Sequence, residues 1–236
     1  MRRGWGLTLG GAAAPAWTPL DLGARLAIWH DAEFVTLTSG AVSSWDDLSG
    51  NGRHATQTTA ASRPTVDATG INGRPALLFD GMNDYLNSVI FRSGTASRSV
   101  FMVWMAETRL TSYAAYYSNG TSGSSGAFIL TSTYASDPTM GGVVGVVEAR
   151  DGQPLLAEGS FAGGSGGAIR VAKNDGAYLT GTRSINTTSA PRIGASPFGG
   201  LWFKGHIGAL VGVADQATSD EVTKIREYFR ARFSLW

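Results

Sequence analysis

Residues 71–86 constrain the fold more than any other stretch, because they alternate turn and strand chemistry twice. The segment begins with Asn72-Gly73, continues through the apolar run Ala76-Leu77-Leu78-Phe79, turns again at Asp80-Gly81 and ends at Tyr85-Leu86. Asn-Gly and Asp-Gly pairs tolerate left-handed backbone and mark tight turns between strands. The pattern predicts antiparallel strands joined by short turns.

The composition fits one large β domain. The chain has 236 residues, of which 32 are glycine, and only 16% are charged. Frequent glycine among short apolar runs is typical of many strands joined by turns, and an apolar fraction of 43% can fill a core between two sheets. The formal net charge of +1 argues against nucleic-acid or anionic-membrane partners. Cysteine is absent, which excludes disulfides, and no apolar run approaches the roughly 18 residues that span a bilayer.

Short apolar runs predict the strands, and one periodic stretch predicts a helix. Strands are expected at residues 26–29, 41–45, 75–80, 99–105, 127–130, 143–147, 169–172 and 201–213. The run 99–105 is β-branched and aromatic, so it predicts a central buried strand. In 201–213, the odd positions are expected to share one apolar face. A helix is expected at about 218–233, where Thr218 and Glu221 fit a capping box and apolar residues recur every three or four positions.

Several segments resemble a known family. They are Trp45-Asp46-Asp47-Leu48-Ser49-Gly50-Asn51-Gly52-Arg53-His54-Ala55, Arg63-Pro64-Thr65-Val66, Asn72-Gly73-Arg74-Pro75 and Phe79-Asp80-Gly81-Met82-Asn83-Asp84-Tyr85-Leu86. Together they resemble the concanavalin A-like, laminin-G-like jelly-roll domains of tailed-bacteriophage and prophage virion proteins and of secreted bacterial proteins. The resemblance covers about residues 22–236. It implies an all-β, antiparallel two-sheet jelly-roll sandwich with one C-terminal α-helix, and it leaves function open because this fold hosts lectins, glycosidases and structural modules.

Residues 1–20 are expected to form an extended N-terminal docking arm, and residues 21–236 the jelly-roll domain. The arm is rich in glycine and cannot bury Trp5, Leu7 and Leu9 by itself, so these side chains are expected to dock onto a partner. The same stretch weakly imitates a secretion signal, but its glycines make a poor hydrophobic helix.

The resemblance and the arm together imply a virion component, such as a tail, fibre or head-decoration protein of the extracellular particle. The expected partners are other virion proteins, further copies of the chain in a homo-oligomer, and a host-surface polysaccharide. Three alternatives stay open. One is a secreted bacterial carbohydrate-binding module, the second is an assembly or decoration protein without a glycan ligand, and the third is a glycosidase with an unrecognised carboxylate pair.

The sequence predicts no catalytic residues. Jelly-roll glycosidases place carboxylates on one strand face, commonly as E-x-D-x-x-E or E-x-D-x-E, so that acid and nucleophile flank the glycosidic bond about 5 Å apart. No glutamate stands in such a pattern, and Glu148 and Asp151 would face opposite sides of a regular strand. No nucleophile motif of the G-x-S-x-G type occurs either. We therefore expect a non-enzymatic structural or adhesion protein.

Two groups of side chains are candidate carbohydrate platforms, because sugar rings stack on aromatic rings while polar groups bind the hydroxyls. The first group is Trp202, Lys204 and His206, which alternate on one strand face, and the second is Tyr113, Tyr116 and Tyr117, beside a glycine-rich loop. The alternative for aromatic residues in a sandwich is a core position, which we expect for Trp29, Trp45 and Trp104.

Four oxygen-bearing side chains are candidate metal ligands, and Ca²⁺ is the one cofactor that the sequence leaves open. They are Asp47, Asn51, Asp80 and Asp84. Ca²⁺ accepts such ligands, and the resemblance implies that related domains hold Ca²⁺ at loop ends. The alternative is turn chemistry, in which Asp and Asn side chains bond the local backbone.

Overall fold

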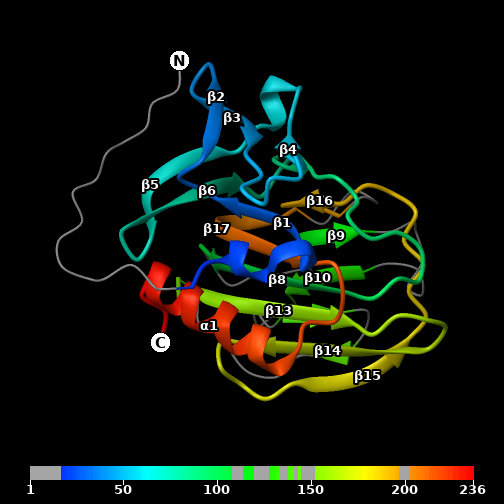
Figure 1. Ribbon diagram of the computed structural model, residues 1–236. Coiled ribbons are helices and arrows are strands. Elements are labelled where there is room, and N and C mark those ends of the chain that lie inside the picture. Colours follow the sequence, from blue (N-terminus) through cyan, green and yellow to red (C-terminus); the bar gives the residue numbers. More distant parts are fainter. Residues whose placement is uncertain are drawn as a thin grey trace.

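The computed structural model describes residues 17–107, 152–196 and 202–236, together with the strand segments 114–119, 128–132, 138–140 and 143–144. These residues form two antiparallel β-sheets and one C-terminal α-helix (Figure 1). The predicted two-sheet architecture with a C-terminal helix is therefore confirmed, whereas the jelly-roll connection of the strands stays a prediction. No described helix is long and apolar enough to cross a membrane.

The strands fall into two sheets. The first sheet holds β1 (Leu26–Asp31), β5 (Thr65–Ile71), β6 (Arg74–Asp80), β8 (Arg98–Ala106), β13 (Leu155–Phe161), β14 (Gly167–Lys173), β15 (Leu179–Arg183) and β17 (Lys204–Val213). Its order is β15-β14-β13-β8-β17-β6-β5, and β1 also pairs with β17. The second sheet holds β2 (Val35–Thr38), β3 (Ala41–Trp45), β4 (Ala55–Thr56), β7 (Leu86–Asn87), β9 (Ala114–Asn119), β10 (Phe128–Ser132), β11 (Pro138–Met140), β12 (Val143–Val144) and β16 (Arg192–Ile193). Its order is β12-β11-β10-β9-β16-β7-β4-β3-β2. The helices are η1 (Pro19–Arg25), η2 (Ala60–Ser62) and α1 (Ser219–Phe233).

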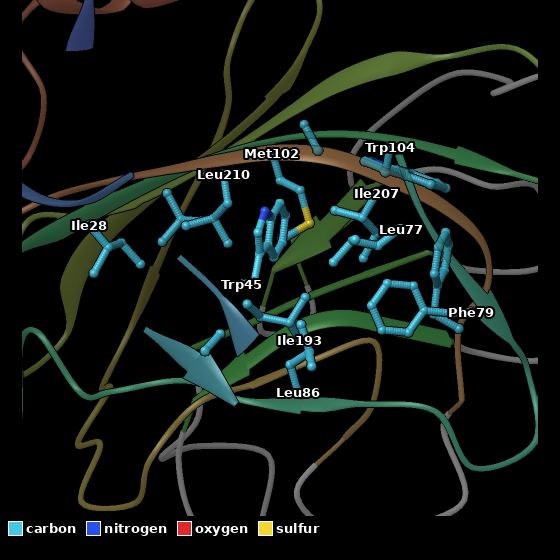
Figure 2. Packing of buried hydrophobic residues seen from close by; sticks show 14 of the residues in the cluster. Ile28, Trp45, Leu77, Phe79, Leu86, Met102, Trp104, Ile193, Ile207 and Leu210 are labelled. Atoms are coloured by element: carbon cyan, nitrogen blue, oxygen red, sulfur yellow. The ribbon is translucent and has the colours of Figure 1, made fainter. Parts of the chain in front are cut away.

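The inner faces of the two sheets pack against each other and form the main core (Figure 2). Trp45 and Ile193 extend from the second sheet towards Met102 and Ile207 of the first, and all four are fully buried. Each large apolar side chain buried in this way contributes about 1.5–3 kcal/mol relative to exposure. Trp104 is also fully buried, which agrees with its expected core position.

The outer face of the first sheet is covered by α1. Phe101 of β8 and Val211 of β17 pack in one buried cluster with Ile225 and Phe229 of the helix, and Figure 1 shows the helix lying over this sheet. Strand β8 is therefore buried on both faces and lies between β13 and β17, as expected for 99–105. In the described part of the chain, no α-helix covers the outer face of the second sheet.

The start of α1 follows from its capping box. The Thr218 hydroxyl accepts a hydrogen bond from the Glu221 backbone N–H at 3.3 Å, and the Glu221 carboxylate accepts one from the Thr218 N–H at 2.7 Å. These bonds satisfy two of the helix N–H groups that have no partner within the helix. The helix ends at Ser234, whose backbone is left-handed.

A β-bulge in β17 corrects the predicted face pattern of 201–213. The pairing of β17 with β8 shifts register between Ile207 and Ala209. As a result Phe203, Ile207 and Leu210 face the core between the sheets, whereas Ala209 and Val211 face α1. The prediction that all odd positions share one face is wrong, because the extra residue of a bulge moves the following side chains to the other face.

Candidate functional site

The outer face of the second sheet carries a row of polar side chains. Strand pairing places Ser44 opposite Thr56, Thr56 opposite Asn87, and Asn87 opposite Arg192. Their neighbours on the inner face are the fully buried Trp45, Ala55, Leu86 and Ile193. Because side chains alternate along a strand, the polar row lies on the face away from the core. We call Ser44, Thr56, Asn87 and Arg192 the polar row.

Two aromatic rings flank one end of the polar row. The rings of Tyr85 and Trp202 lie 6.1 Å apart between centroids at an angle of 43°. The guanidinium carbon of Arg192 lies 4.6 Å from the centre of the Tyr85 ring. All three side chains are partly exposed. We call this group of Tyr85, Arg192 and Trp202 the Trp202 site.

The loop before β7 positions Tyr85. The carboxylate of Asp80 accepts hydrogen bonds from the backbone N–H groups of Met82 at 2.8 Å and Asn83 at 3.2 Å, and Asp84 accepts one from the Asp80 N–H at 3.0 Å. These contacts close the loop on itself, with Met82 at its exposed tip. Burial, together with the neighbouring Asp80 charge, raises the pKa of Asp84 from 3.8 to about 6. A carboxyl group that holds its proton to mildly acidic pH therefore lies next to Tyr85 in the sequence.

The other two candidate calcium ligands hold a different loop. The Asp47 carboxylate accepts bonds from the backbone N–H groups of Trp29 at 3.0 Å and Arg53 at 2.9 Å. Burial opposes ionisation of Asp47, but these donors hold its pKa below the usual range. The side-chain amide of Asn51 donates to the backbone oxygens of Leu26 and Ala27. The four candidates thus belong to two loops. The three carboxylates accept hydrogen bonds from backbone N–H groups, and the Asn51 amide donates to backbone oxygens. Within the described residues, no three carboxylate or histidine side chains gather as a metal site would require.

The structure separates Trp202 from the other two residues of the first predicted platform. Lys204 and His206 alternate with core-facing residues of β17, so they lie on the outer face of the first sheet. The Lys204 ammonium lies 3.6 Å from the Glu107 carboxylate, and His206 is buried with its Nε2 3.0 Å from the Asp67 carboxylate. Trp202 precedes the strand and forms an isolated bridge with Ala195 instead.

The remaining sequence candidates fall on residues of which little is described. Tyr113 of the second platform and Trp5, Leu7 and Leu9 of the arm lie outside the described residues. Tyr116 and Tyr117 belong to β9, where only the backbone is described, and Tyr117 pairs with Ile193 and Leu130.

Two residues of the Trp202 site were not predicted as ligands. In the sequence, Tyr85 belongs only to the resembling segment, and no motif marks Arg192. Leu86 and Ile193 are apolar and face the core, so strict alternation along each strand would have placed Tyr85 and Arg192 on the outer face. The contact between them depends on the pairing of β7 with β16, which joins segments about a hundred residues apart in the chain.

Sequence comparison finds no match, whereas comparison of folds finds similar solved structures. No protein-family model matches the chain, and no curated protein matches its sequence. A solved GH54 α-L-arabinofuranosidase soaked with a cyclic sulfate inhibitor is similar at a TM-score of 0.65 and 13% identity, over 92% of this chain and 66% of that one. Domain 4 of AbnA, a GH43 extracellular arabinanase from Geobacillus stearothermophilus, in complex with arabinotriose, is similar at 0.58 and 15%, over 86% of this chain and 98% of that one. A Trypanosoma rangeli sialidase with the inhibitor DANA is similar at 0.56 and 13%, over 92% and 34%.

These likenesses define the class of fold. At such identities they show the fold alone, which is the β-sandwich found in these three solved structures. The chain spans just under two thirds of the arabinofuranosidase and about a third of the sialidase. None of these three structures is described as a virion protein.

The comparison also corrects the prediction that the chain is not an enzyme. That prediction treated the missing glutamate pattern as grounds to exclude hydrolysis. It is wrong, because solved structures of similar fold include a GH54 arabinofuranosidase and a domain of a GH43 arabinanase. Hydrolysis of a glycan therefore belongs among the activities to be tested.

Proposed function

We propose that the outer face of the second sheet binds a glycan, with a sugar ring stacked at the Trp202 site. The observation that carries this proposal is that the partly exposed Tyr85 ring contacts both the Trp202 ring and the Arg192 guanidinium, on the face that no described α-helix covers. Aromatic faces bind the apolar face of a sugar ring, and adjacent donors and acceptors bind its hydroxyls.

The polar row favours a chain of sugars over a single one. Neighbouring strands lie about 4.8 Å apart, so Thr56, Asn87 and Arg192 offer polar groups at that interval across the strands. Thr56 and Asn87 are exposed. An extended oligosaccharide lying across β4, β7 and β16 would meet one such group at each strand, starting from the ring held by Tyr85 and Trp202.

Isothermal titration calorimetry tests this proposal. Arabinotriose is the first probe, because it is the ligand bound to the similar arabinanase domain. A panel of other neutral and acidic oligosaccharides follows. Trp202→Ala should abolish binding of whichever glycan binds, whereas Trp236→Ala should leave it unchanged. Trp236 is a matched control, since it is 39% exposed and its ring contacts Arg230 on the C-terminal helix. Equal binding by wild type and Trp202→Ala would refute the proposed site.

Hydrolysis of the bound glycan is a second candidate, favoured by Asp84. A glycosidase needs a carboxylic acid that stays protonated near neutral pH to protonate the leaving group. Burial raises the pKa of Asp84 to about 6, and the residue lies directly before Tyr85. Release of reducing ends from the bound glycan, lost in Asp84→Asn with binding intact, would support this role. Absence of release from every glycan that binds would reject it.

Placement on a virion is a separate proposal that rests on the sequence resemblance. It assigns residues 1–20 to attachment and the sandwich to host-surface glycans, with many copies raising the affinity. Deleting residues 1–20 should abolish attachment to the particle and leave glycan binding unchanged. Normal incorporation of the shortened chain would refute the docking role, and a mature protein from which residues 1–14 have been cleaved would favour a secreted carbohydrate-binding module.

A further inference from the structure

Arg192 has donors that the described residues do not use. Its one hydrogen bond to a described residue runs from Nη1 to the Ser196 backbone oxygen at 3.4 Å, which is long for such a bond. No described carboxylate forms an ion pair with it, whereas Arg25 lies 2.7 Å from Glu221 and Arg232 lies 3.0 Å from Asp31. A guanidinium carries five N–H donors, so most of those on Arg192 remain free for a ligand.

The position of Arg192 is also fixed. Its backbone is paired on both sides, with β7 at Asn87 and with β9 at Ser118. Its contact with the Tyr85 ring, at 4.6 Å, is shorter than the other described contacts between arginine and an aromatic ring, which measure 5.4–6.0 Å. Stacking uses the face of the guanidinium and leaves the N–H groups along its edge. The Arg192 guanidinium, held in this way, loses little conformational freedom when a ligand binds to its N–H groups.

The geometry points to a glycan that bears a carboxylate, with the acid group held by Arg192 while a sugar ring rests on Tyr85 and Trp202. A carboxylate matches the planar fork of a guanidinium and accepts two parallel N–H bonds. The carboxylates of Asp80 and Asp84 already accept loop N–H groups. This inference rests on the proposed glycan site and adds the class of sugar, a uronic acid or a similar sugar acid.

The experiment compares uronate trimers with their methyl esters, which keep the sugar and remove the charge. Galacturonate, mannuronate and guluronate trimers are titrated by calorimetry at pH 7 into wild type, Arg192→Gln, Arg192→Lys and the control Arg230→Gln. Arg230 also stacks on an aromatic ring, at 6.0 Å from Trp236, but on the C-terminal helix. Wild type and Arg230→Gln should bind at least one acid about tenfold or more tightly than its ester.

The variants separate charge from stacking. Arg192→Gln should bind acid and ester equally, with the ester affinity near that of wild type. Arg192→Lys should retain only part of the preference, because a lysine cannot form the bidentate contact. Equal wild-type affinity for every acid and its ester, or a preference unchanged in Arg192→Gln, would overturn the inference. If neutral oligosaccharides bind through Trp202 without any preference for acids, the inference fails and the proposed glycan site stands. If no glycan binds at all, both fail.

Discussion

The buried ion pair between β13 and α1 should be the most damaging one to break. Glu158 lies in the middle of β13, and its side chain is only 1% exposed. Arg226 of α1 binds both carboxylate oxygens, with Nη2 3.0 Å from Oε2, and the Tyr178 hydroxyl donates to Oε2 at 2.7 Å. Arg226→Met would leave a buried charge with only the tyrosine as partner. Breaking such a pair from one side costs about 3–5 kcal/mol, and the remaining tyrosine bond favours the lower half of that range.

The stability lost in Arg226→Met should depend on pH, and it should be larger at high pH than at low pH. Burial raises the pKa of Glu158 above its ordinary 4.5, although Arg226 and Tyr178 act against this shift. Because the folded state then binds the proton more tightly than the unfolded state, Glu158 favours folding at low pH, and this contribution is lost as pH rises through the folded pKa. Removing Arg226 raises that pKa further. Arg226→Met should therefore lose less stability below pH 4.5 than at pH 8.

Urea unfolding followed by tryptophan fluorescence measures these differences. The set comprises wild type, Arg226→Met, Glu158→Gln, the double variant and Arg230→Met, which is an exposed arginine on the same helix. The double variant should regain more than half of the stability lost in Arg226→Met, since no buried charge remains. Arg230→Met should change stability by less than about 0.5 kcal/mol. A loss below about 1 kcal/mol in Arg226→Met, or no recovery in the double variant, would refute the reasoning.

Three further predictions concern stability. Asp84→Asn should be more stable than wild type at pH 8 and about equally stable below pH 3.8. The reason is that the pKa of Asp84 is raised from 3.8 to about 6, so the wild-type folded state loses stability as pH rises from 3.8 through about 6. Urea unfolding of both proteins at the two pH values measures this difference. Gly194→Ala should lower the free energy of unfolding by about 1–3 kcal/mol more than Gly40→Ala. The two glycines have nearly the same φ, +85° and +84°, but only at Gly194 would the new methyl group meet the Phe79 ring, at 2.3 Å. Equal urea midpoints for the two variants would contradict this. Thr218→Ala should lower the free energy of unfolding by about 1 kcal/mol through loss of the cap, and Thr218→Ser should not; equal stability of the two variants would argue against the cap.

Much of the fold was predictable because local chemistry and burial agree in it. The turns around residues 72 and 80 and the apolar run 99–105 lie where the sequence placed them, and the Thr218 cap starts the helix. Strand β13 shows where local chemistry fails. Its sequence contains Glu158 between apolar residues, so it lacks the pattern of a buried strand, yet all seven of its residues are buried. The charge is tolerated only because α1, some seventy residues later, supplies Arg226.

The site was harder to predict than the fold, because it depends on long-range pairing. Alternation correctly placed Lys204 and His206 on one face of β17, but the face is that of the first sheet, where His206 is buried beside Asp67. Trp202 lies before the strand and meets Tyr85, a residue more than a hundred positions earlier. Nothing local in either segment indicates that contact.

The first sheet packs against the helix, whereas the second sheet carries the proposed binding face. Residues of β8 alternate between the core and the helix, so both faces of the first sheet are committed to packing at this central strand, and substitutions there act on folding. In the strands of the second sheet whose side chains are described, the inner face packs in the core and the outer face carries the polar row. Substitutions at Thr56, Asn87 and Arg192 should therefore change ligand affinity with little change in stability, since surface substitutions outside such packing usually alter it by less than about 0.5 kcal/mol. If this face binds a glycan as proposed, its side chains can change the ligand preference while the fold stays the same.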